Sequence, residues 1–188
     1  MRVIVPVHVL LILSAVWTSA HAQETPPMPE MPKPTKQHEW LQQKLAGEWE
    51  TTVTIHMPGQ PAMTSRGTAA TRPLGKFWIQ SEHRGEMMGA PYVGLQTLGF
   101  NAEKQQFVGT WIDSMSDYQW DYRGQLNDKR NQLTLLCEGP CPMKPGGLSK
   151  FKEVLEVQDD DHLTFTSSVQ QDDGSWQKGM EIKYARKR

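Results

Sequence analysis

Asp113 is the acidic residue of this chain that is best placed for chemistry, because it shares a predicted strand face with aromatic side chains. Side chains alternate between the two faces of a strand, so the odd-numbered positions of residues 106–115 form one face. That face carries Phe107, Gly109, Trp111, Asp113 and Met115. Two interpretations follow: Asp113 is a structural anchor that accepts hydrogen bonds or pairs with an arginine, or it orients a ligand or transfers a proton with a raised pKa.

A second aromatic face and one histidine belong to the same predicted interior. Tyr118, Trp120 and Tyr122 alternate with polar residues, so we assign all three inward. In residues 77–87 the charged side chains share one face, which is typical of a solvated surface, and this directs His83 inward. His83 is then either a satisfied interior residue or a metal ligand. A metal site needs several ligands, and the other histidines lie on scattered segments, so we predict no metal and no other cofactor.

Sequence motifs of known catalytic sites are absent from the chain. We find no Gly-x-Ser-x-Gly turn, no phosphate-binding glycine loop, no dinucleotide fingerprint and no His-x-x-x-His helix. An enzyme that acts through Asp113 with His83 or an arginine stays an alternative, because isolated residues inside a barrel form no recognisable motif.

Short alternating strands must position these residues. Runs of about 6 to 11 residues, separated by turns rich in Gly, Pro, Asn and Asp, predict a meandering antiparallel sheet. The expected strands are Glu48–Met57, Ala62–Arg72, Phe77–Met87, Tyr92–Phe100, Gln106–Met115, Tyr118–Leu126, Gln132–Cys137, Phe151–Val157, Leu163–Gln170 and Trp176–Arg186. An open sheet of that size would expose two long edges, whereas closure removes them. We therefore predict an all-β fold, a single antiparallel up-and-down barrel of about ten strands.

The two ends of this barrel have different signals. Trp49 begins the first strand and Arg186 ends the last one, so that a guanidinium can stack on an indole and plug one end. Thr35 is a predicted N-cap, and residues 36–46 have the apolar spacing of a short amphipathic helix before Gly47. We expect this helix to cover one end of the barrel.

The N-terminal residues predict export. Residues 1–22 combine Arg2, an apolar run and small residues around Ala22, as in a cleaved signal peptide. The apolar run is shorter than a membrane-spanning helix requires, so no membrane span is expected. We predict that residues 23–35 are a Pro-rich, disordered linker and that residues 36–188 form the barrel domain. We expect a periplasmic or secreted protein after cleavage near Ala22.

Charge argues against nucleic acid as a partner. Lys and Arg total 20 and Asp and Glu total 21, and the two signs are interspersed along the chain. Proteins that neutralise phosphates need a basic patch or stripe, and the only basic cluster lies at the C-terminus.

Two cysteines, Cys137 and Cys141, enclose Glu138-Gly139-Pro140. In an exported protein this spacing predicts a disulfide that closes a turn. The surrounding segment, Glu138 to Ser149, is expected to be an ordered loop. A metal or redox function is the alternative for the pair.

Four segments together resemble a known bacterial family. They are His38–Leu41 through Gly47–Glu50, Tyr92–Gly94 through Leu98–Asn101, Thr110–Met115, and Met180–Lys187. The chain resembles the family designated domain of unknown function 1579. This resemblance implies a calycin-like barrel, similar in shape to lipocalins and fatty-acid-binding proteins, and no established activity.

The resemblance to those barrels gives Tyr184 and Arg186 two possible roles. An inward Tyr and Arg two residues apart hold a carboxylate in fatty-acid-binding proteins, and the reversed order here allows the same chemistry. Alternatively, Arg186 closes the barrel floor against Trp49, as in lipocalins.

Three hypotheses for function remain at this point. The first is a barrel that binds a small apolar or aromatic molecule among its inward Trp and Tyr side chains. The second is a barrel enzyme that uses Asp113. The third is an envelope interaction or assembly protein, which predicts an exposed apolar patch in place of a cavity.

Overall fold

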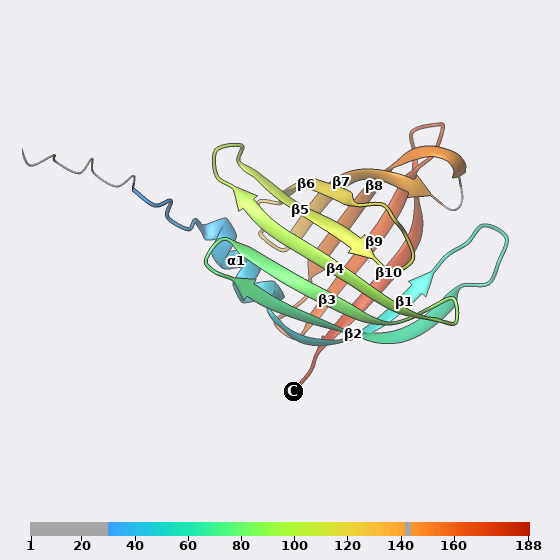
Figure 1. Ribbon diagram of the computed structural model, residues 1–188, viewed down its shortest axis with the longest axis horizontal. Coiled ribbons are helices and arrows are strands. Elements are labelled where there is room, and N and C mark those ends of the chain that lie inside the picture. The colour runs from blue at the N-terminus through green and yellow to red at the C-terminus, as the bar shows by residue number, and fades with distance from the viewer. Residues whose placement is uncertain (1–29, 142–143) are drawn as a thin grey trace, which may run out of the picture. The chain divides into compact units, whose positions relative to one another are not determined.

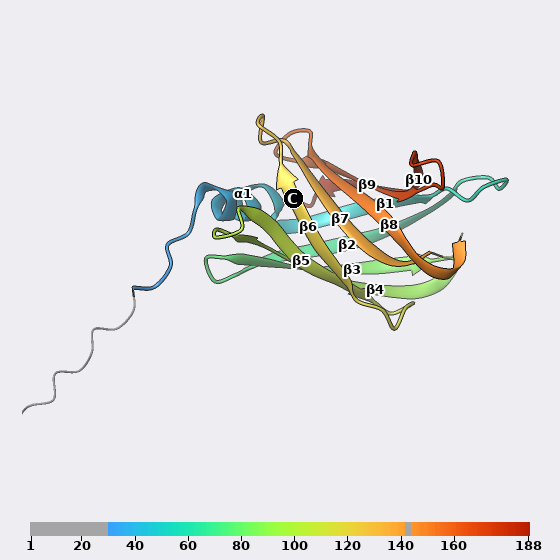
Figure 2. The same cartoon turned by 90° about the horizontal axis from the view of Figure 1, so that it is seen from above.

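Ten antiparallel strands form a closed barrel in the computed structural model, which describes residues 30–141 and 144–188. The strands are β1 (Gly47–Ile55), β2 (Met63–Leu74), β3 (Trp78–Met87), β4 (Ala90–Asn101), β5 (Gln106–Asp113), β6 (Trp120–Leu126), β7 (Gln132–Cys141), β8 (Lys144–Val157), β9 (His162–Gln170) and β10 (Trp176–Arg186). Each strand pairs with its neighbours in sequence, and β1 pairs with β10 to close the barrel (Figures 1 and 2). The predicted all-β, up-and-down barrel is confirmed.

Alternation of side chains fills the interior as the sequence predicts. In β7, Leu133, Leu135 and Cys137 are buried while Leu136 between them is exposed. On β5, Phe107 is buried and contacts Phe100 and Trp40 edge to face. The odd-numbered face of β5, which carries Asp113, is therefore the inward one.

One helix, α1 (Lys36–Leu45), covers the end of the barrel where β1 begins and β10 ends (Figure 1). Thr35 is its N-cap, as predicted, and Trp40, Leu41 and Leu45 are buried under it. Trp40 Nε1 donates a hydrogen bond to the Arg130 carbonyl at 2.8 Å. These contacts attach α1 to the barrel rim through both apolar packing and hydrogen bonds.

His38 is a structural residue of this closed end. Its Nδ1 accepts a hydrogen bond from the Thr35 backbone N–H at 2.9 Å, so its Nε2 carries the hydrogen and donates to the Phe100 carbonyl at 2.9 Å. The ring is buried and joins the start of α1 to β4.

Trp49 and Arg186 meet beneath α1. The Arg186 guanidinium carbon lies 4.0 Å from the Trp49 ring centroid, within the roughly 6 Å of a cation–π contact. Arg186 also donates to the Ala46 carbonyl at 2.8 Å and to the Asp160 carbonyl at 2.9 Å. Gly47 has φ +141°, and a Cβ on it would collide with Arg186 Nη1. Glycine at position 47 thus makes room for the guanidinium.

The predicted loop from Glu138 to Ser149 is wrong. β7 continues to Cys141 and β8 begins at Lys144, with Glu138 opposite Lys150 and Pro140 opposite Leu148. The prediction excluded Pro140 from a strand because proline has no amide hydrogen to donate to a neighbouring strand. Beyond Leu136, β7 pairs only with β8, and proline is tolerated in a strand that is unpaired on one side.

The predicted Cys137–Cys141 disulfide is also corrected, because both thiols are free and buried. The two residues lie four positions apart on one continuous strand. Four residues of extended chain span about 13 Å, whereas a disulfide needs Cα atoms about 4.4 to 6.8 Å apart. A tight turn would bring the pair together, and a strand holds them apart.

Residues Lys33–Arg188 form one compact unit that contains α1 and the whole barrel. The predicted signal peptide, residues 1–22, lies outside the described residues, as does most of the predicted linker. Within residues 30–141 and 144–188, no helix is long and apolar enough to cross a membrane.

Candidate functional site

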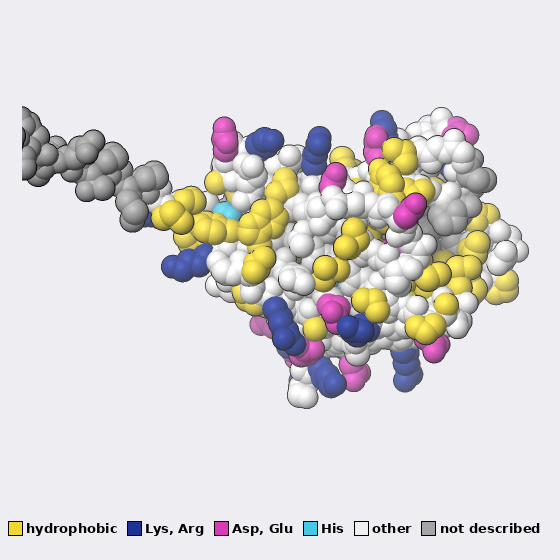
Figure 3. Space-filling view, in the orientation of Figure 1, with side chains coloured by type: hydrophobic (Ala, Val, Ile, Leu, Met, Phe, Trp, Pro, Cys, Tyr) yellow, Lys and Arg dark blue, Asp and Glu magenta, His cyan; other side chains and the backbone are white. Residues whose placement is uncertain are grey.

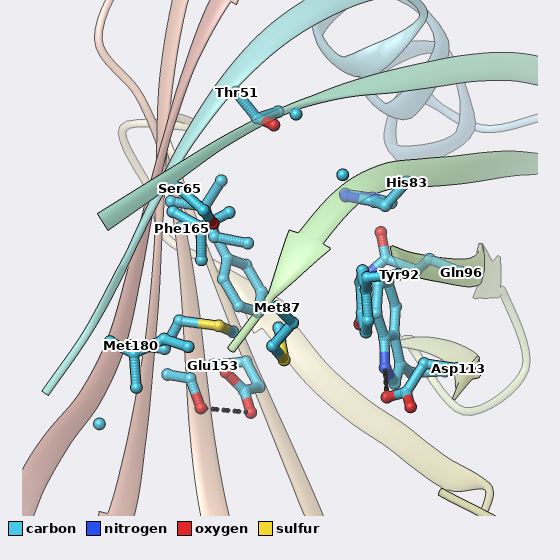
Figure 4. Close-up of a pocket in the computed structure, with 18 of the residues that line it drawn as sticks. Thr51, Ser65, His83, Met87, Tyr92, Gln96, Asp113, Glu153, Phe165 and Met180 are labelled. Atoms are coloured by element: carbon cyan, nitrogen blue, oxygen red, sulfur yellow. Dashed lines mark hydrogen bonds between the residues drawn. The ribbon is translucent and has the colours of Figure 1, made fainter. Parts of the chain in front are cut away.

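A cavity of about 360 Å³ occupies the barrel interior and reaches the end opposite α1. Met57, Met88 and Cys141, which lie at the turns and strand ends of that side, belong to its lining. Inward aromatic, aliphatic and sulfur-containing side chains form most of the wall, among them Val53, Ile55, Met87, Trp111, Trp120, Phe151, Leu155, Phe165, Met180 and Ile182. Figure 4 labels Met87, Phe165 and Met180 among the side chains around the space.

Six of the residues that the sequence assigned to the interior line this cavity: His83, Trp111, Asp113, Trp120, Tyr122 and Tyr184. Tyr118 and Arg186, which the sequence also placed there, are not in the lining. Tyr118 packs edge to face on Trp120, with ring centroids 5.2 Å apart. Arg186 lies at the closed end against Trp49, so Tyr184 and Arg186 do not form a carboxylate-binding pair in the cavity.

Asp113 is held by hydrogen bonds at both carboxylate oxygens. Oδ2 accepts from Trp111 Nε1 at 2.9 Å, and Oδ1 accepts from the Met115 backbone N–H at 2.8 Å (Figure 4 shows the former). Burial raises the pKa of Tyr92, and the charge of Asp113 raises it further. The two hydrogen bonds of Asp113 fit a carboxylate that orients the Trp111 ring and the start of the turn after β5.

His83 lies in the middle of the cavity wall on β3. Burial lowers its pKa to about 4, so the ring is neutral near neutral pH. Nε2 is 3.1 Å from Ser81 Oγ, which accepts a hydrogen bond from Thr71 at 2.7 Å. The ring contacts Trp111 and Tyr184 edge to face. Among residues 30–141 and 144–188, no three His, Cys, Asp or Glu side chains gather as metal ligands would.

Glu153 on β8 is an acidic cavity residue that the sequence did not single out. The side chain is only 6% exposed and lines the cavity. Oε1 accepts a hydrogen bond from Ser167 Oγ at 3.0 Å, while Oε2 is buried without a hydrogen-bond partner. Burial raises the pKa of this carboxyl to about 8. The signal was present in the alternation: Glu153 shares the odd-numbered face of β8 with Phe151, Leu155 and Val157.

Two tyrosine hydroxyls accompany this carboxyl. Burial raises the pKa of Tyr122 and of Tyr184, and the charge of Glu153 raises both further. Neither hydroxyl forms a hydrogen bond with another described residue. Neither oxygen is fully buried, in contrast to Glu153 Oε2. Both therefore remain available to a molecule in the cavity.

Comparison with known proteins supports the fold. The crystal structure of Rv2717c from M. tuberculosis is 12% identical, with a TM-score of 0.62 over 83% of this chain and 100% of that one. The S-type phycobiliprotein lyase CPES from Guillardia theta is 10% identical, with a TM-score of 0.52 over 80% and 92% of the two chains. Such low identities establish a shared barrel and nothing further. None of the curated proteins matches the sequence significantly. The model of one family, described as protein of unknown function (DUF1579), matches residues 33–186, so the chain belongs to that family.

Proposed function

We propose that this protein binds a small, largely apolar or aromatic molecule in the barrel interior. The observation that carries the proposal is the cavity of about 360 Å³, walled by Trp, Tyr, Phe, Met and aliphatic side chains. Pockets for small molecules typically measure about 300 to 1,000 Å³ and combine an apolar wall with a few polar groups. Tyr122, Tyr184 and Glu153 supply such polar groups here.

The same geometry gives less support to acid–base chemistry by Asp113 and His83. Both oxygens of Asp113 are engaged in hydrogen bonds, and the lowered pKa of His83 makes it a weak base. An assembly function has less support as well. The exposed large apolar side chains include Leu74, Met88, Ile112, Leu136 and Leu148, which belong to five separate strands or turns, and Figure 3 shows apolar and charged groups interspersed on one face.

The proposal includes export to the periplasm or the medium, on the strength of the signal-peptide features of residues 1–22. Protein purified from its own host should begin at or near Gln23. An N-terminal sequence that still contains the apolar run would refute this part of the proposal.

A cavity-filling variant tests the binding function. Ser65 lines the cavity, while Thr64 on the same strand is exposed. Ser65→Phe should fill part of the space, and Thr64→Phe is the matched control on the outer face. Native mass spectrometry of protein from its own host should show an added mass on wild type and Thr64→Phe that Ser65→Phe lacks.

A titration with the neutral fluorophore naphthylmethanol complements that experiment. Wild type and Thr64→Phe should bind the fluorophore with the same affinity, and Ser65→Phe should bind about 10-fold more weakly or worse. Binding to none of the proteins, together with no added mass on wild type, would contradict the proposed function.

A further inference from the structure

In the described part of the chain, the acidic residues at inward positions of the cavity have no inward Lys or Arg beside them. Two carboxyls, Asp113 and Glu153, stand at inward positions of its wall. Arg66, Arg84 and Glu86 border the space too, but each occupies an outward strand position and is exposed. In residues 30–141 and 144–188, no other Lys or Arg borders the cavity. A ligand carboxylate would thus meet no inward cation here, whereas a positive group would meet two acidic groups, of which Glu153 can ionise to pair with it.

Glu153 is the carboxyl that lacks a partner. Asp113 uses both oxygens within the chain, whereas Glu153 uses only Oε1 and leaves Oε2 buried and unpaired. A buried acceptor without a hydrogen bond costs roughly 1 to 3 kcal/mol of stability. A ligand donor that bonds to this oxygen therefore recovers about that free energy on binding. The torsion that turns a carboxyl group is broad, and either oxygen can face an incoming group.

We propose that the ligand carries a protonated nitrogen on its apolar or aromatic body, and that Glu153 is its counter-ion. This inference rests on the proposed binding function and adds the chemical class of the ligand. The aromatic rings of Trp111, Trp120 and Tyr122 line the same space and provide π faces that favour a cation over a neutral group. Tyr122 and Tyr184 remain free to hydrogen-bond the rest of the ligand.

Pairing with a cation must release a proton. In the free protein the pKa of Glu153, about 8, keeps most of the carboxyl protonated near neutral pH. The titratable groups that face it are Tyr122 on β6, Cys137 on β7 and Tyr184 on β10, and burial raises the pKa of each. None of them supplies a positive charge. When the protonated nitrogen binds, the carboxyl O–H bond breaks, its proton goes to solvent, and the carboxylate pairs with the cation.

Three naphthyl probes of similar size separate charge from hydrophobicity: naphthylmethylamine, which is a cation near neutral pH, the neutral naphthylmethanol, and the anion naphthoate. Equilibrium titration by fluorescence should give wild-type affinities in the order amine, alcohol, acid. The amine should bind at least about 10-fold more tightly than the alcohol. Calorimetry of amine binding in buffers of different ionisation enthalpy should detect release of up to one proton near neutral pH.

Glu153→Gln should lose the proton release and the preference for the amine, so that its affinities for amine and alcohol agree within about 3-fold. Glu156→Gln is the matched control, because Glu156 lies on the same strand with its side chain exposed. This variant should behave as wild type with all three probes.

The outcomes distinguish the two proposals. Equal wild-type affinity for amine and alcohol, or an amine preference that persists in Glu153→Gln, overturns the assignment of a cationic ligand to Glu153 and leaves the binding function standing. A preference that disappears in Asp113→Asn but persists in Glu153→Gln also overturns it. Failure of wild type to bind any probe counts against the binding function itself. The proton-release measurement needs only wild type, so it tests the assignment even if Glu153→Gln folds poorly.

Discussion

Arg186 stacks on Trp49 at the closed end of the barrel, with the guanidinium carbon 4.0 Å from the ring centroid, and the same two residues are direct partners in the β1–β10 register. The pair that closes the sheet is therefore also the pair that plugs its floor. Trp49 is almost completely buried and donates from Nε1 to the Leu45 carbonyl at 3.0 Å, so the stack connects both terminal strands to the end of α1.

Replacement of Arg186 by Ala should lower the free energy of unfolding without loss of ligand binding. A cation–π contact contributes about 0.5 to 2 kcal/mol, and each lost hydrogen bond about 0.5 to 1.5 kcal/mol. Arg186 forms one such contact and two hydrogen bonds to carbonyls, so we expect a total loss of roughly 1.5 to 5 kcal/mol in urea unfolding. The loss should be smaller for Arg186→Lys, which keeps the charge. Loss of naphthylmethanol binding with unchanged stability would show instead that Arg186 anchors the ligand.

Glu153 should make the stability of the protein depend on pH. Its pKa is about 8 in the folded state and about 4.5 when unfolded, so between these values the folded state holds a proton that the unfolded state has lost. Stability therefore falls as pH rises from about 4.5 to about 8, by up to about 5 kcal/mol at 1.36 kcal/mol per pKa unit. Glu153→Gln should remove this decline.

The measurement is the difference in unfolding free energy between Glu153→Gln and wild type at about pH 5 and about pH 8.5. The variant should gain relative to wild type as pH rises. A difference that stays constant with pH would mean that Glu153 is ionised in the folded protein throughout.

His83 should produce a pH dependence of the opposite sign. Its pKa falls from 6.5 to about 4 on folding, so between these values the unfolded state binds a proton that the folded state does not. Wild type should lose up to about 3 kcal/mol as pH falls from about 6.5 to about 4. His83→Gln lacks this loss, and urea unfolding of both proteins across that range measures it. If the unfolding free energies of the two proteins change in parallel over this pH range, His83 is protonated in the folded state.

Cys137 and Cys141 should behave as two unreactive thiols in the folded protein. Both are buried, and burial raises the pKa of Cys137, which suppresses the reactive thiolate. A thiol-alkylating reagent should modify neither cysteine under native conditions. In denaturant without reductant it should modify both. Intact-protein mass spectrometry measures the number of modified cysteines. Reduction should leave the melting temperature unchanged. If alkylation in denaturant occurs only after reduction, the two cysteines form a disulfide after all.

The sequence by itself was sufficient for the architecture. Strand alternation is a local property: whether a residue such as Phe107 or Tyr122 faces inward depends on the parity of its position, which can be read from its neighbours. Regularly spaced turns then predict a meander, and a meander that closes must pair its first strand with its last. For this reason the sequence is enough to assign Trp49 and Arg186 to the same end of the barrel.

The tertiary structure alone decided which inward groups meet and which remain unpaired. Glu153 and Ser167 lie on β8 and β9, and their contact depends on the register between those strands, which local sequence does not encode. The same holds for Pro140, whose place in β7 is tolerated because β6 no longer pairs there. Alternation along β8 determines the parity of Glu153. Whether its Oε2 has a hydrogen-bond partner depends on the whole barrel, because a donor could come from any strand that borders the cavity.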